Sequence, residues 1–270
     1  MDTIQTDVSD HALTTAIRAN LCAFFRYMGG SFPENYIENQ KYARWHLPVA
    51  HPWFNGVLCS SLPEESDSCF IEDSIQYFRA RNVRSFTWWM EPHLKCQDGE
   101  ALLSPHGFRF FNDTPGMALD LQRMVRPAQE VEDLEVREVT DDASLRAWAH
   151  VFTTGYGLPA VWEPSVYDLE IRLGFNLPIR SFLGYWNGEP AATSTLFLGA
   201  GVAGIYNVAT LPGARGKGIG GAMTHRPLLD ARGMGYRIGI LQSSEMGFGV
   251  YQKLGFRHLC QIEHFHLAFP

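Results

Sequence analysis

The clearest chemical pattern in this sequence is the glycine-rich segment at residues 215–220, which reads RGKGIG. The residues before it have the pattern of a strand and those after it the pattern of a helix, so the segment forms the turn between them. Glycines let a turn approach an anion closely, and the amide N–H groups at a helix N-terminus point towards it. Arg215 and Lys217 add positive charge. The segment therefore fits a ligand that carries a pyrophosphate.

Two other interpretations of this turn stay open. Gly216, Gly218 and Gly221 also satisfy the G-x-G-x-x-G pattern of dinucleotide-binding folds. Such a fold would place a parallel strand before the turn and an acid at the end of the next strand, whereas hairpins precede this turn and Gln242 and Ser243 end that strand. The glycines could also serve only to end a strand and begin a helix. The pyrophosphate interpretation accounts for the charges as well.

Two segments resemble the signatures of one family. Arg215-x-x-Gly218-x-Gly220 resembles the R/Q-x-x-G-x-G/A motif of the GNAT superfamily of N-acetyltransferases, and residues 250–256 (VYQKLGF) resemble the L-Y-x-K-x-G-F signature of the same superfamily. The order strand, helix, strand, helix is also that of the family. The resemblance covers residues 134–269, about half of the chain, and it implies an enzyme that transfers an acyl group from acyl-coenzyme A to an amine.

The resemblance also implies which residues bind the cofactor. The turn would bind the pyrophosphate, and the end of the preceding strand would pair its backbone with the pantetheine arm, so this strand and the next should splay apart. Thr210 stands where the family usually has valine, and Ser244 where many relatives have asparagine. The residues expected to bind acetyl-coenzyme A are Val208, Ala209, Thr210, Arg215, Gly216, Lys217, Gly218, Ile219, Gly220, Ser244 and Tyr251.

Tyr251 matches the tyrosine that protonates the coenzyme A thiolate in the family, and a phenol is a proton donor at neutral pH. Plain core packing is the alternative for this residue. The base that accepts a proton from the amine is harder to place. Alternation puts Gly204, Tyr206, Val208 and Thr210 on one face of the preceding strand, and none is a carboxylate or a histidine.

We therefore expect a water chain through Tyr206, Asn207 or Ser243 to remove that proton, or an acid from elsewhere, with Glu245 and Glu163 as candidates. Surface solvation is the alternative role for both glutamates. No metal is expected, because no partners with metal-ligand spacing accompany the histidines His225, His264 and His266. An acceptor groove could be lined by the aromatic and apolar residues Trp148, Phe152, Tyr156 and Leu158, for which core packing is the alternative.

The elements that position these residues follow from hydrophobic periodicity. In the second half we expect a strand at 134–139 and a helix at 143–153, followed by three hairpin strands at 181–186, 191–198 and 202–210. A helix at 219–232, a strand at 237–241, a helix at 247–254 and a strand at 262–269 complete it. The predicted fold class is α/β, with a mixed, mostly antiparallel sheet flanked by helices.

The first half has a similar outline. It shows helices at 11–27 and 71–81 and strands at 56–59, 83–90 and 116–121, and a polar linker follows. Residues 54–57, 77–81 and 103–108 echo residues 206–208, 228–232 and 251–256 at nearly the same offset. The predicted organisation is a tandem pair, with a degenerate GNAT-like domain at residues 1–126 and a catalytic GNAT domain at residues 127–270.

The first domain is expected to be non-catalytic. Residues 61–67, at the position of the glycine turn, contain no glycine and three acids, which would repel a pyrophosphate. The position that matches the catalytic tyrosine falls near Leu103. This domain could instead complete an acceptor pocket or cover the cofactor.

The overall composition narrows the function further. With 270 residues, 46% hydrophobic and 19% charged, the chain can form well-packed domains, and its net charge of −7 argues against nucleic-acid binding. Its five cysteines form no C-x-x-C pair, and no stretch predicts a signal peptide or a membrane span, so a cytoplasmic protein is expected. A homodimer remains possible.

The predicted function is transfer of an acetyl or other small acyl group from acetyl-coenzyme A to an amine, with a small molecule as the expected acceptor. The alternatives are a non-catalytic acyl-coenzyme A-binding sensor or assembly module, favoured by the missing strand base, and an NAD-dependent oxidoreductase.

Overall fold

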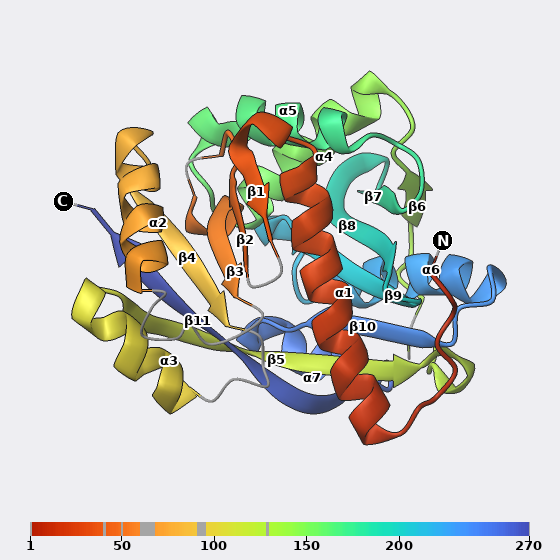
Figure 1. The fold of residues 1–270 in the computed structure, drawn as a ribbon. Helices are drawn as coiled ribbons and strands as arrows, with labels where there is room; N and C mark the ends of the chain where they lie inside the picture. Colours follow the sequence, from red (N-terminus) through yellow and green to blue (C-terminus); the bar gives the residue numbers. More distant parts are fainter. Residues whose placement is uncertain are drawn as a thin grey trace. The chain divides into compact units, whose positions relative to one another are not determined.

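A computed structural model describes residues 2–39, 42–49, 51–59, 68–90, 96–127 and 130–269 of the chain (Figure 1). It divides into two compact units, residues 1–24 with 115–260 and residues 25–114 with 261–270. This division differs from the predicted cut at residue 126, because three elements cross between the units. They are the helix α1 (Asp10–Gly30) and the strands β5 (Arg109–Asp120) and β11 (Arg257–Ala268).

The first unit is built on a sheet in which β5, β10, β9, β8, β7 and β6 are neighbours in this order. Only β9 and β10 run parallel, and the other four pairs are antiparallel. The sheet is thus mixed and mostly antiparallel, as the sequence predicts. Its other strands are β6 (Leu134–Glu138), β7 (Ile179–Trp186), β8 (Glu189–Gly199), β9 (Val202–Thr210) and β10 (Ile238–Gln242).

The helices of the first unit flank this sheet. Besides the start of α1 they are α4 (Asp142–Gly155), α5 (Glu163–Leu173), α6 (Ile219–Gly233) and α7 (Glu245–Lys253), with short 3-10 turns at η5 (Leu121–Arg123), η6 (Ala160–Trp162) and η7 (Pro212–Ala214). The sequence predicted all of these α-helices except α5. The core beside α6 contains Ala192, Leu196, Ile205, Ile219, Met223 and Leu228.

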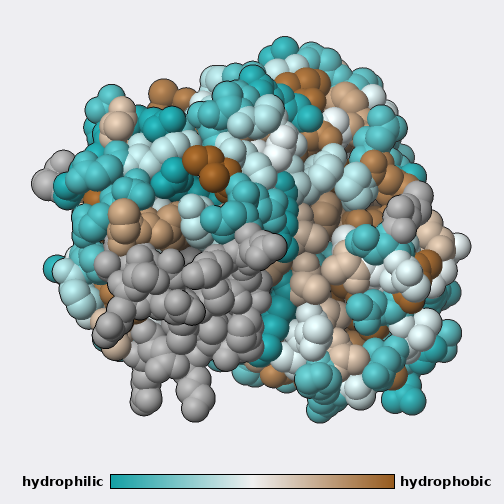
Figure 2. Space-filling model, in the orientation of Figure 1, coloured by the Kyte–Doolittle hydropathy of each residue, from teal (hydrophilic) through white to brown (hydrophobic). Residues whose placement is uncertain are grey.

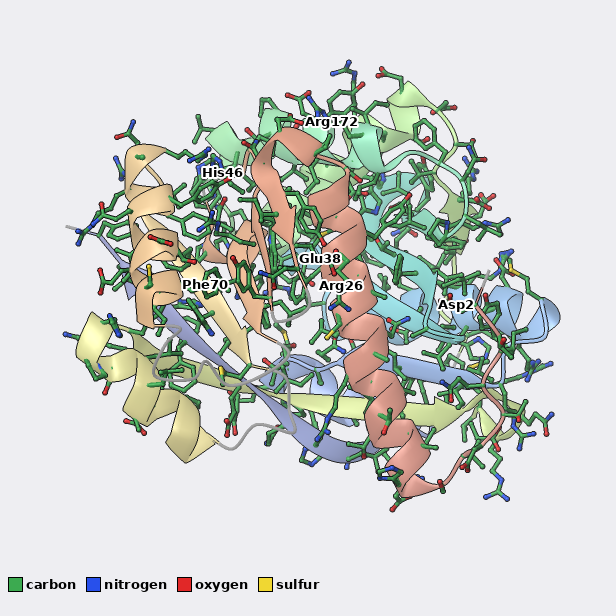
Figure 3. The ribbon with its side chains drawn as sticks, viewed as in Figure 1. Asp2, Arg26, Glu38, His46, Phe70 and Arg172 are labelled. Carbon is green, nitrogen blue, oxygen red and sulfur yellow. The ribbon has the colours of Figure 1, made fainter. Side chains whose placement is uncertain are left out.

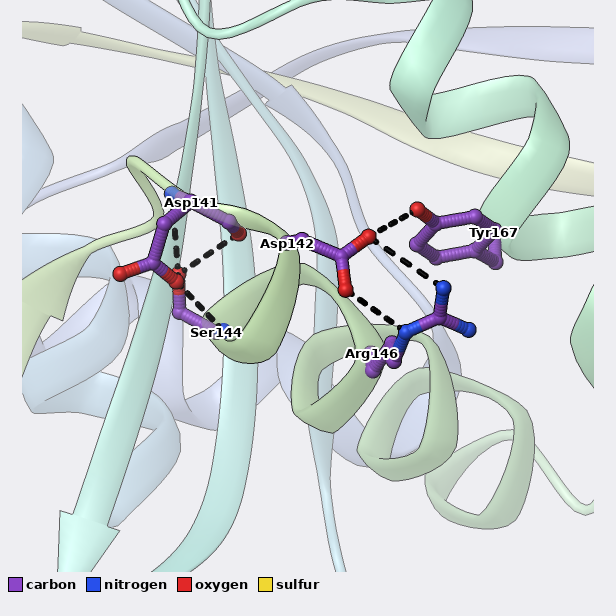
Figure 4. Close-up of polar contacts among 5 residues, drawn as sticks. All are labelled: Asp141, Asp142, Ser144, Arg146 and Tyr167. Atoms are coloured by element: carbon purple, nitrogen blue, oxygen red, sulfur yellow. Dashed lines mark hydrogen bonds and ion pairs between the residues drawn. The ribbon is translucent and has the colours of Figure 1, made fainter.

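Helix α4 begins at a well-defined cap (Figure 4). The Asp141 side chain accepts a hydrogen bond from the Ser144 amide over 2.8 Å, and the Ser144 side chain completes a capping box. Asp142 then pairs with Arg146 over 2.8 Å and accepts a hydrogen bond from the Tyr167 hydroxyl. These contacts fix the start of α4 and join it to α5.

The second unit contains the strands β1, β2, β3, β4 and β11, which are neighbours in this order and of which only β3 and β4 run parallel. An ion pair of 2.6 Å between Arg26 and Glu38, both labelled in Figure 3, joins α1 to β1. The core contains Ile71, Phe78, Phe86, Trp88, Phe108 and Phe265. The remaining elements are η1 (Pro33–Asn35), β1 (Tyr36–Glu38), β2 (Tyr42–His46), η2 (Pro52–Phe54), β3 (Asn55–Cys59), α2 (Ser68–Ala80), β4 (Ser85–Met90), α3 (Cys96–Leu103) and η4 (Ser104–His106).

The two units share an order of elements. The run β3, α2, β4, α3, β5 matches the run β9, α6, β10, α7, β11, and in both runs the first two strands are parallel neighbours. The three sequence echoes fall on corresponding elements of these runs. The acidic segment at residues 61–67 lies outside the described residues.

Hydrophilic and hydrophobic residues are interspersed over the face of the molecule shown in Figure 2. Within the described part of the chain, no helix combines the length and the hydropathy needed to cross a bilayer.

Candidate active site

Strand β9 parts from β10 halfway along its length. The parallel pairing joins Ala203 to Gly239, Gly204 to Ile240 and Ile205 to Leu241, whereas β9 itself continues to Thr210. The backbone of β9 beyond Ile205 therefore has a free edge on this side. An extended ligand could pair with this edge, whereas the splay that the family resemblance implies stays a prediction.

A β-bulge accompanies the end of this pairing. Opposite Thr193 and Thr195 of β8, strand β9 carries one residue more than regular pairing allows, since Thr195 pairs with Tyr206 and Thr193 with Ala209. Within the bulge, Asn207 has a φ of 55°, in the left-handed region that asparagine tolerates better than most residues. A bulge bends and twists its strand, so the course of β9 changes at this point.

The glycine-rich turn lies between the end of β9 and α6. Gly216 and Gly218 have φ values of 76° and 83°, and Gly218 is the N-cap of α6. No side-chain hydrogen bond caps this end of α6 within the described structure, and the first amides of a helix have no intrahelical partner. A Cβ added at Gly216 would meet no described atom within 4 Å. The amides are thus open to an anion.

The two cations of the turn differ in what they contact. Arg215 points back into the protein, where Nε donates to the Thr210 carbonyl over 3.1 Å and a terminal nitrogen donates to the Gly155 carbonyl over 2.7 Å. Lys217 is exposed, with Nζ lying 5.0 Å from the centre of the Trp186 ring. Arg215 therefore braces the turn against β9 and α4, a role that the sequence did not predict.

Gly155 at the end of α4 also packs closely on β9. A Cβ placed there would come within 2.9 Å of the Ala209 Cβ and 3.4 Å of the Thr210 nitrogen. The end of α4 thus supports the free part of β9.

Tyr251 is buried in α7. Burial raises the pKa of its hydroxyl to about 12, and a hydrogen bond with Thr224 acts in the opposite direction. The Thr224 hydroxyl in turn donates to the Gly220 carbonyl over 2.9 Å, which links Tyr251 to the first turn of α6. At neutral pH the phenol is fully protonated and can donate a proton. Tyr156, at the C-terminus of α4, lies near Tyr251: burial raises the pKa of Tyr156, and Tyr251 adds to this effect.

The Ser244 hydroxyl caps α7, because its Oγ accepts a hydrogen bond from the Gly247 amide over 3.2 Å. The Ser243 hydroxyl donates to the Ser244 carbonyl over 2.7 Å. Both hydroxyls therefore hold the N-terminus of α7, and their direct contact with a cofactor stays a prediction.

Tyr206 and Asn207, two of the three residues that the sequence predicts as alternatives for a water chain, form separate contacts. The Tyr206 hydroxyl donates to Asn20 of α1 over 2.7 Å, its ring stacks on Phe24 with centres 3.9 Å apart, and burial raises its pKa well above the ordinary value. Asn207 instead donates from Nδ2 to the Thr195 hydroxyl over 3.2 Å. Asn20 was not identified from the sequence.

Through Thr195 and Ser181, Asn207 is connected to a buried carboxyl group that was not predicted from the sequence. Thr195 lies 3.3 Å from the Ser181 hydroxyl, which donates to Glu170 of α5 over 3.1 Å. Glu170 is only 6% exposed. A signal for it exists in the sequence, because the buried residues of α5 recur at helical spacing and Glu170 occupies one of these core positions. They are Val166, Leu169, Glu170 and Leu173.

The other residues considered as bases or metal ligands lie in surface ion pairs, at exposed positions or in packed surroundings. Glu163 pairs with His150 over 2.9 Å at the surface, and Glu245 is exposed at the start of α7. Burial lowers the pKa of His264 and His266 to about 4, as the packing interpretation expects. In the described ranges, no three His, Cys, Asp or Glu side chains form a group that could hold a metal ion.

The aromatic residues of α4 also belong to packing. Trp148 is fully buried and stacks on Phe152, with ring centres 5.0 Å apart.

A mixed sheet with one parallel pair that ends early, followed by a glycine turn and an uncapped helix, defines the acyl-coenzyme A N-acyltransferase class of fold. Comparison with known proteins agrees. Residues 200–259 match the family model of the acetyltransferase (GNAT) domain. No curated protein matches the sequence.

Solved structures extend the likeness over most of the chain. A GCN5-related N-acetyltransferase from Kribbella flavida aligns with a TM-score of 0.66 at 15% identity, over 93% of this chain and 96% of that one. A GCN5-related N-acetyltransferase from Sphaerobacter thermophilus aligns with a TM-score of 0.59 at 14% identity, over 85% and 81%.

A tandem GNAT protein from the clavulanic acid biosynthesis pathway has a TM-score of 0.58 at 13% identity, over 85% of this chain and 80% of that one. At these identities the comparisons establish the fold, which is the tandem GNAT fold, and they leave the substrate open.

Proposed function

We propose that this protein transfers an acetyl or other small acyl group from acyl-coenzyme A to the amine of a small molecule. The observation that carries the proposal is the free edge of β9 beyond Ile205, directly before an uncapped, glycine-rich helix N-terminus. The free edge of β9 can pair with the amide-rich pantetheine arm, and the helix N-terminus can bind the pyrophosphate. All of these residues lie within the part matched by the GNAT family model.

In this proposal the cofactor is held by backbone more than by side chains. The amides of Gly216, Lys217, Gly218, Ile219 and Gly220 bind the pyrophosphate, with Lys217 adding its exposed charge. Arg215 keeps the turn at the correct distance from β9 through its bonds to the Thr210 and Gly155 carbonyls.

The bound cofactor supplies an activated thioester carbonyl. A backbone amide among Val208, Ala209 and Thr210 polarises this carbonyl as the amine nitrogen attacks its carbon. When the C–S bond breaks, the Tyr251 hydroxyl gives its proton to the departing thiolate, and the proton released by the attacking amine returns to the tyrosine, directly or through water. The raised pKa of Tyr251 keeps its hydroxyl protonated at neutral pH before the transfer. Positioning the two reactants supplies the rest of the rate enhancement.

We also propose that residues 1–126 form the non-catalytic member of the tandem pair. The parallel strands β3 and β4 remain paired up to the last residue of β3, where Cys59 is opposite Met90. In the other unit, the pairing with β10 ends at Ile205, five residues before β9 ends. Among the described residues, β3 therefore has no comparable unpaired length facing β4 for a pantetheine arm.

The test is calorimetric titration with acetyl-coenzyme A, beside NAD as a control ligand. Gly220→Glu is the informative variant, because Gly220 has no left-handed φ and a Cβ there would come no closer than 3.9 Å to its nearest neighbour, Thr210 Oγ1. A carboxylate in the first turn of a helix favours the helix but repels a pyrophosphate. Gly220→Ala is the matched control.

We expect wild type and Gly220→Ala to bind acetyl-coenzyme A, and Gly220→Glu to remain folded and lose binding. Thiol release in the presence of a panel of small amines then tests transfer. Absence of binding to wild type would refute the cofactor assignment. Binding without thiol release from any amine would favour a sensor, and binding of NAD alone would favour an oxidoreductase.

A further inference from the structure

Four polar side chains form a continuous chain from α5 to the bulge in β9. The Ser181 hydroxyl donates to Oε2 of Glu170, the Ser181 and Thr195 hydroxyl oxygens are 3.3 Å apart, and Nδ2 of Asn207 donates to Thr195. Ser181 and Thr195 are cross-strand partners in β7 and β8, so their side chains lie on the same face of the sheet. The chain connects a buried carboxyl group to the strand proposed to bind the acyl donor.

The charge of Glu170 sets the direction of these hydrogen bonds. A carboxylate can only accept, so Ser181 donates to it and accepts from Thr195. The Thr195 oxygen then accepts from Nδ2 of Asn207, which leaves the carbonyl oxygen Oδ1 of that amide for another partner. A protonated carboxyl can donate to Ser181 instead. The hydroxyls can then point the other way, and the Asn207 amide must turn over to accept from Thr195.

We propose that Glu170 is a positioning residue for acyl transfer, whose carboxylate acts through Ser181 and Thr195 to keep Oδ1 of Asn207 free for a hydrogen bond from the acceptor amine. This inference rests on the function proposed above and adds the group that orients the acceptor. An attacking amine carries N–H groups that need an acceptor, and β9 offers no carboxylate or histidine to serve them. The Asn207 carbonyl oxygen meets that need without itself becoming charged.

The surroundings of Glu170 let its charge change near neutral pH. Burial raises the pKa of its carboxyl from 4.5 to about 7, opposed by the Ser181 hydrogen bond. On α5 itself, Asp168 and Arg172 are exposed. Charged groups on the neighbouring elements are held in ion pairs of their own: Arg146 with Asp142 at 2.8 Å, His150 with Glu163 at 2.9 Å and Arg180 with Glu138 at 3.3 Å.

The first experiment is a pH profile of acyl transfer at saturating acetyl-coenzyme A, with an acceptor whose own amine titrates outside the range studied. For wild type we expect kcat/KM for the amine to rise as pH increases through the titration of Glu170. Glu170→Gln should flatten this rise and lower kcat/KM at pH 8 by roughly 10- to 100-fold, the range of one hydrogen bond to a charged group. The KM for acetyl-coenzyme A should not change.

Two further variants interrupt the chain while leaving the carboxyl in place. Ser181→Ala and Thr195→Val should each reproduce the loss in kcat/KM for the amine. Asp168→Asn removes an exposed charge from the same helix and is the matched control, for which we expect the wild-type profile.

The second experiment needs no turnover. The side-chain amide signals of Asn207 are followed by nuclear magnetic resonance as pH is varied in ¹⁵N-labelled protein. We expect them to shift with the titration of Glu170 and to lose this dependence in both Glu170→Gln and Ser181→Ala. A merely structural role for Glu170 would not couple its charge to this amide.

The outcomes separate the two proposals. If wild type transfers acyl groups but Glu170→Gln keeps the rise with pH, the positioning role is overturned and the enzymatic function stands. If wild type transfers no acyl group, the proposed function fails. The Asn207 signals then still show whether the charge of Glu170 is coupled to the Asn207 amide. If the Asn207 amide signals do not shift as Glu170 titrates, the inference is overturned in either case.

Discussion

Replacing Glu170 by glutamine should make the protein more stable above about pH 4.5, by an amount that grows until about pH 7 and then stays constant. Burial raises the folded-state pKa of this carboxyl from 4.5 to about 7. A raised carboxyl pKa means that the folded state holds its proton more tightly than the unfolded state does. The stabilisation is complete below pH 4.5 and is lost as pH rises to 7, because the folded protein must then carry a buried charge that has no ion-pair partner among the described residues.

The size of this effect follows from the shift. From 4.5 to about 7 is a difference of about 2.5 pKa units, and each unit corresponds to about 1.36 kcal/mol, so the wild type should lose about 3 kcal/mol of unfolding free energy across this window. Glutamine is close in size to a protonated glutamate and does not titrate. The two proteins should therefore be similar at pH 4, and Glu170→Gln should be more stable by about 3 kcal/mol at pH 8.

The measurement is urea unfolding of both proteins at pH values from 4 to 8, with the difference between them plotted against pH. Taking the difference cancels the titration of groups that both proteins share. Asp168→Asn controls for the removal of a negative charge from the same helix, and its difference from wild type should not grow with pH in this way. A flat difference for Glu170→Gln, or one that falls as pH rises, would refute the argument that burial penalises this carboxylate.

Three other variants test the proposed acid and the backbone around the cofactor site. Tyr251→Phe should bind acetyl-coenzyme A normally, as measured by calorimetry, but its turnover, measured by thiol release, should fall by at least about 100-fold. Equal turnover would contradict the acid role. Gly218→Ala forces a side chain into a φ of 83°, so we expect a loss of about 1–2 kcal/mol in unfolding free energy and weaker cofactor binding. Gly155→Ala would bring a Cβ within 2.9 Å of Ala209, and both stability and acetyl-coenzyme A affinity should fall; unchanged affinity would mean that α4 does not support β9.

The glycine turn could be predicted from the sequence because its chemistry is local. Glycines at positive φ, a helix start and adjacent cations are all encoded within six residues, and the structure places Gly216 and Gly218 in the left-handed region. The hairpin between β7 and β8 could also be predicted from the sequence, because Asn187 and Gly188 form the tight turn that joins the two strands.

The division into units could not be predicted in the same way. It depends on which distant strands pair, and hydrophobic periodicity does not specify pairing partners. The end of β5 pairs with β10 in one unit, and the end of β11 pairs with β4 in the other. A cut at residue 126 follows the order of the chain, whereas residues 1–24 belong to the same unit as residues 115–260, and residues 261–270 to the same unit as residues 25–114.

Glu170 was missed for a related reason. Its helix, α5, has a proline near its start and polar residues over much of its length, so no helix was predicted there. Its importance depends on contacts with Ser181 on the next strand and, through Thr195, with a residue 37 positions away. A single glutamate at a core position is visible in the sequence only after the helix itself has been recognised.

The bulge at Asn207 connects the binding and the chemical parts of this site. The extra residue bends β9, and the free edge that can pair with a cofactor begins immediately before it, after Ile205. Asn207 has a left-handed backbone conformation, and its side-chain Nδ2 donates a hydrogen bond to Thr195. Glycine would tolerate this backbone but would lack the amide, and most other residues would be strained there. Asparagine is thus one of the few residues that can both open the strand and join it to Glu170.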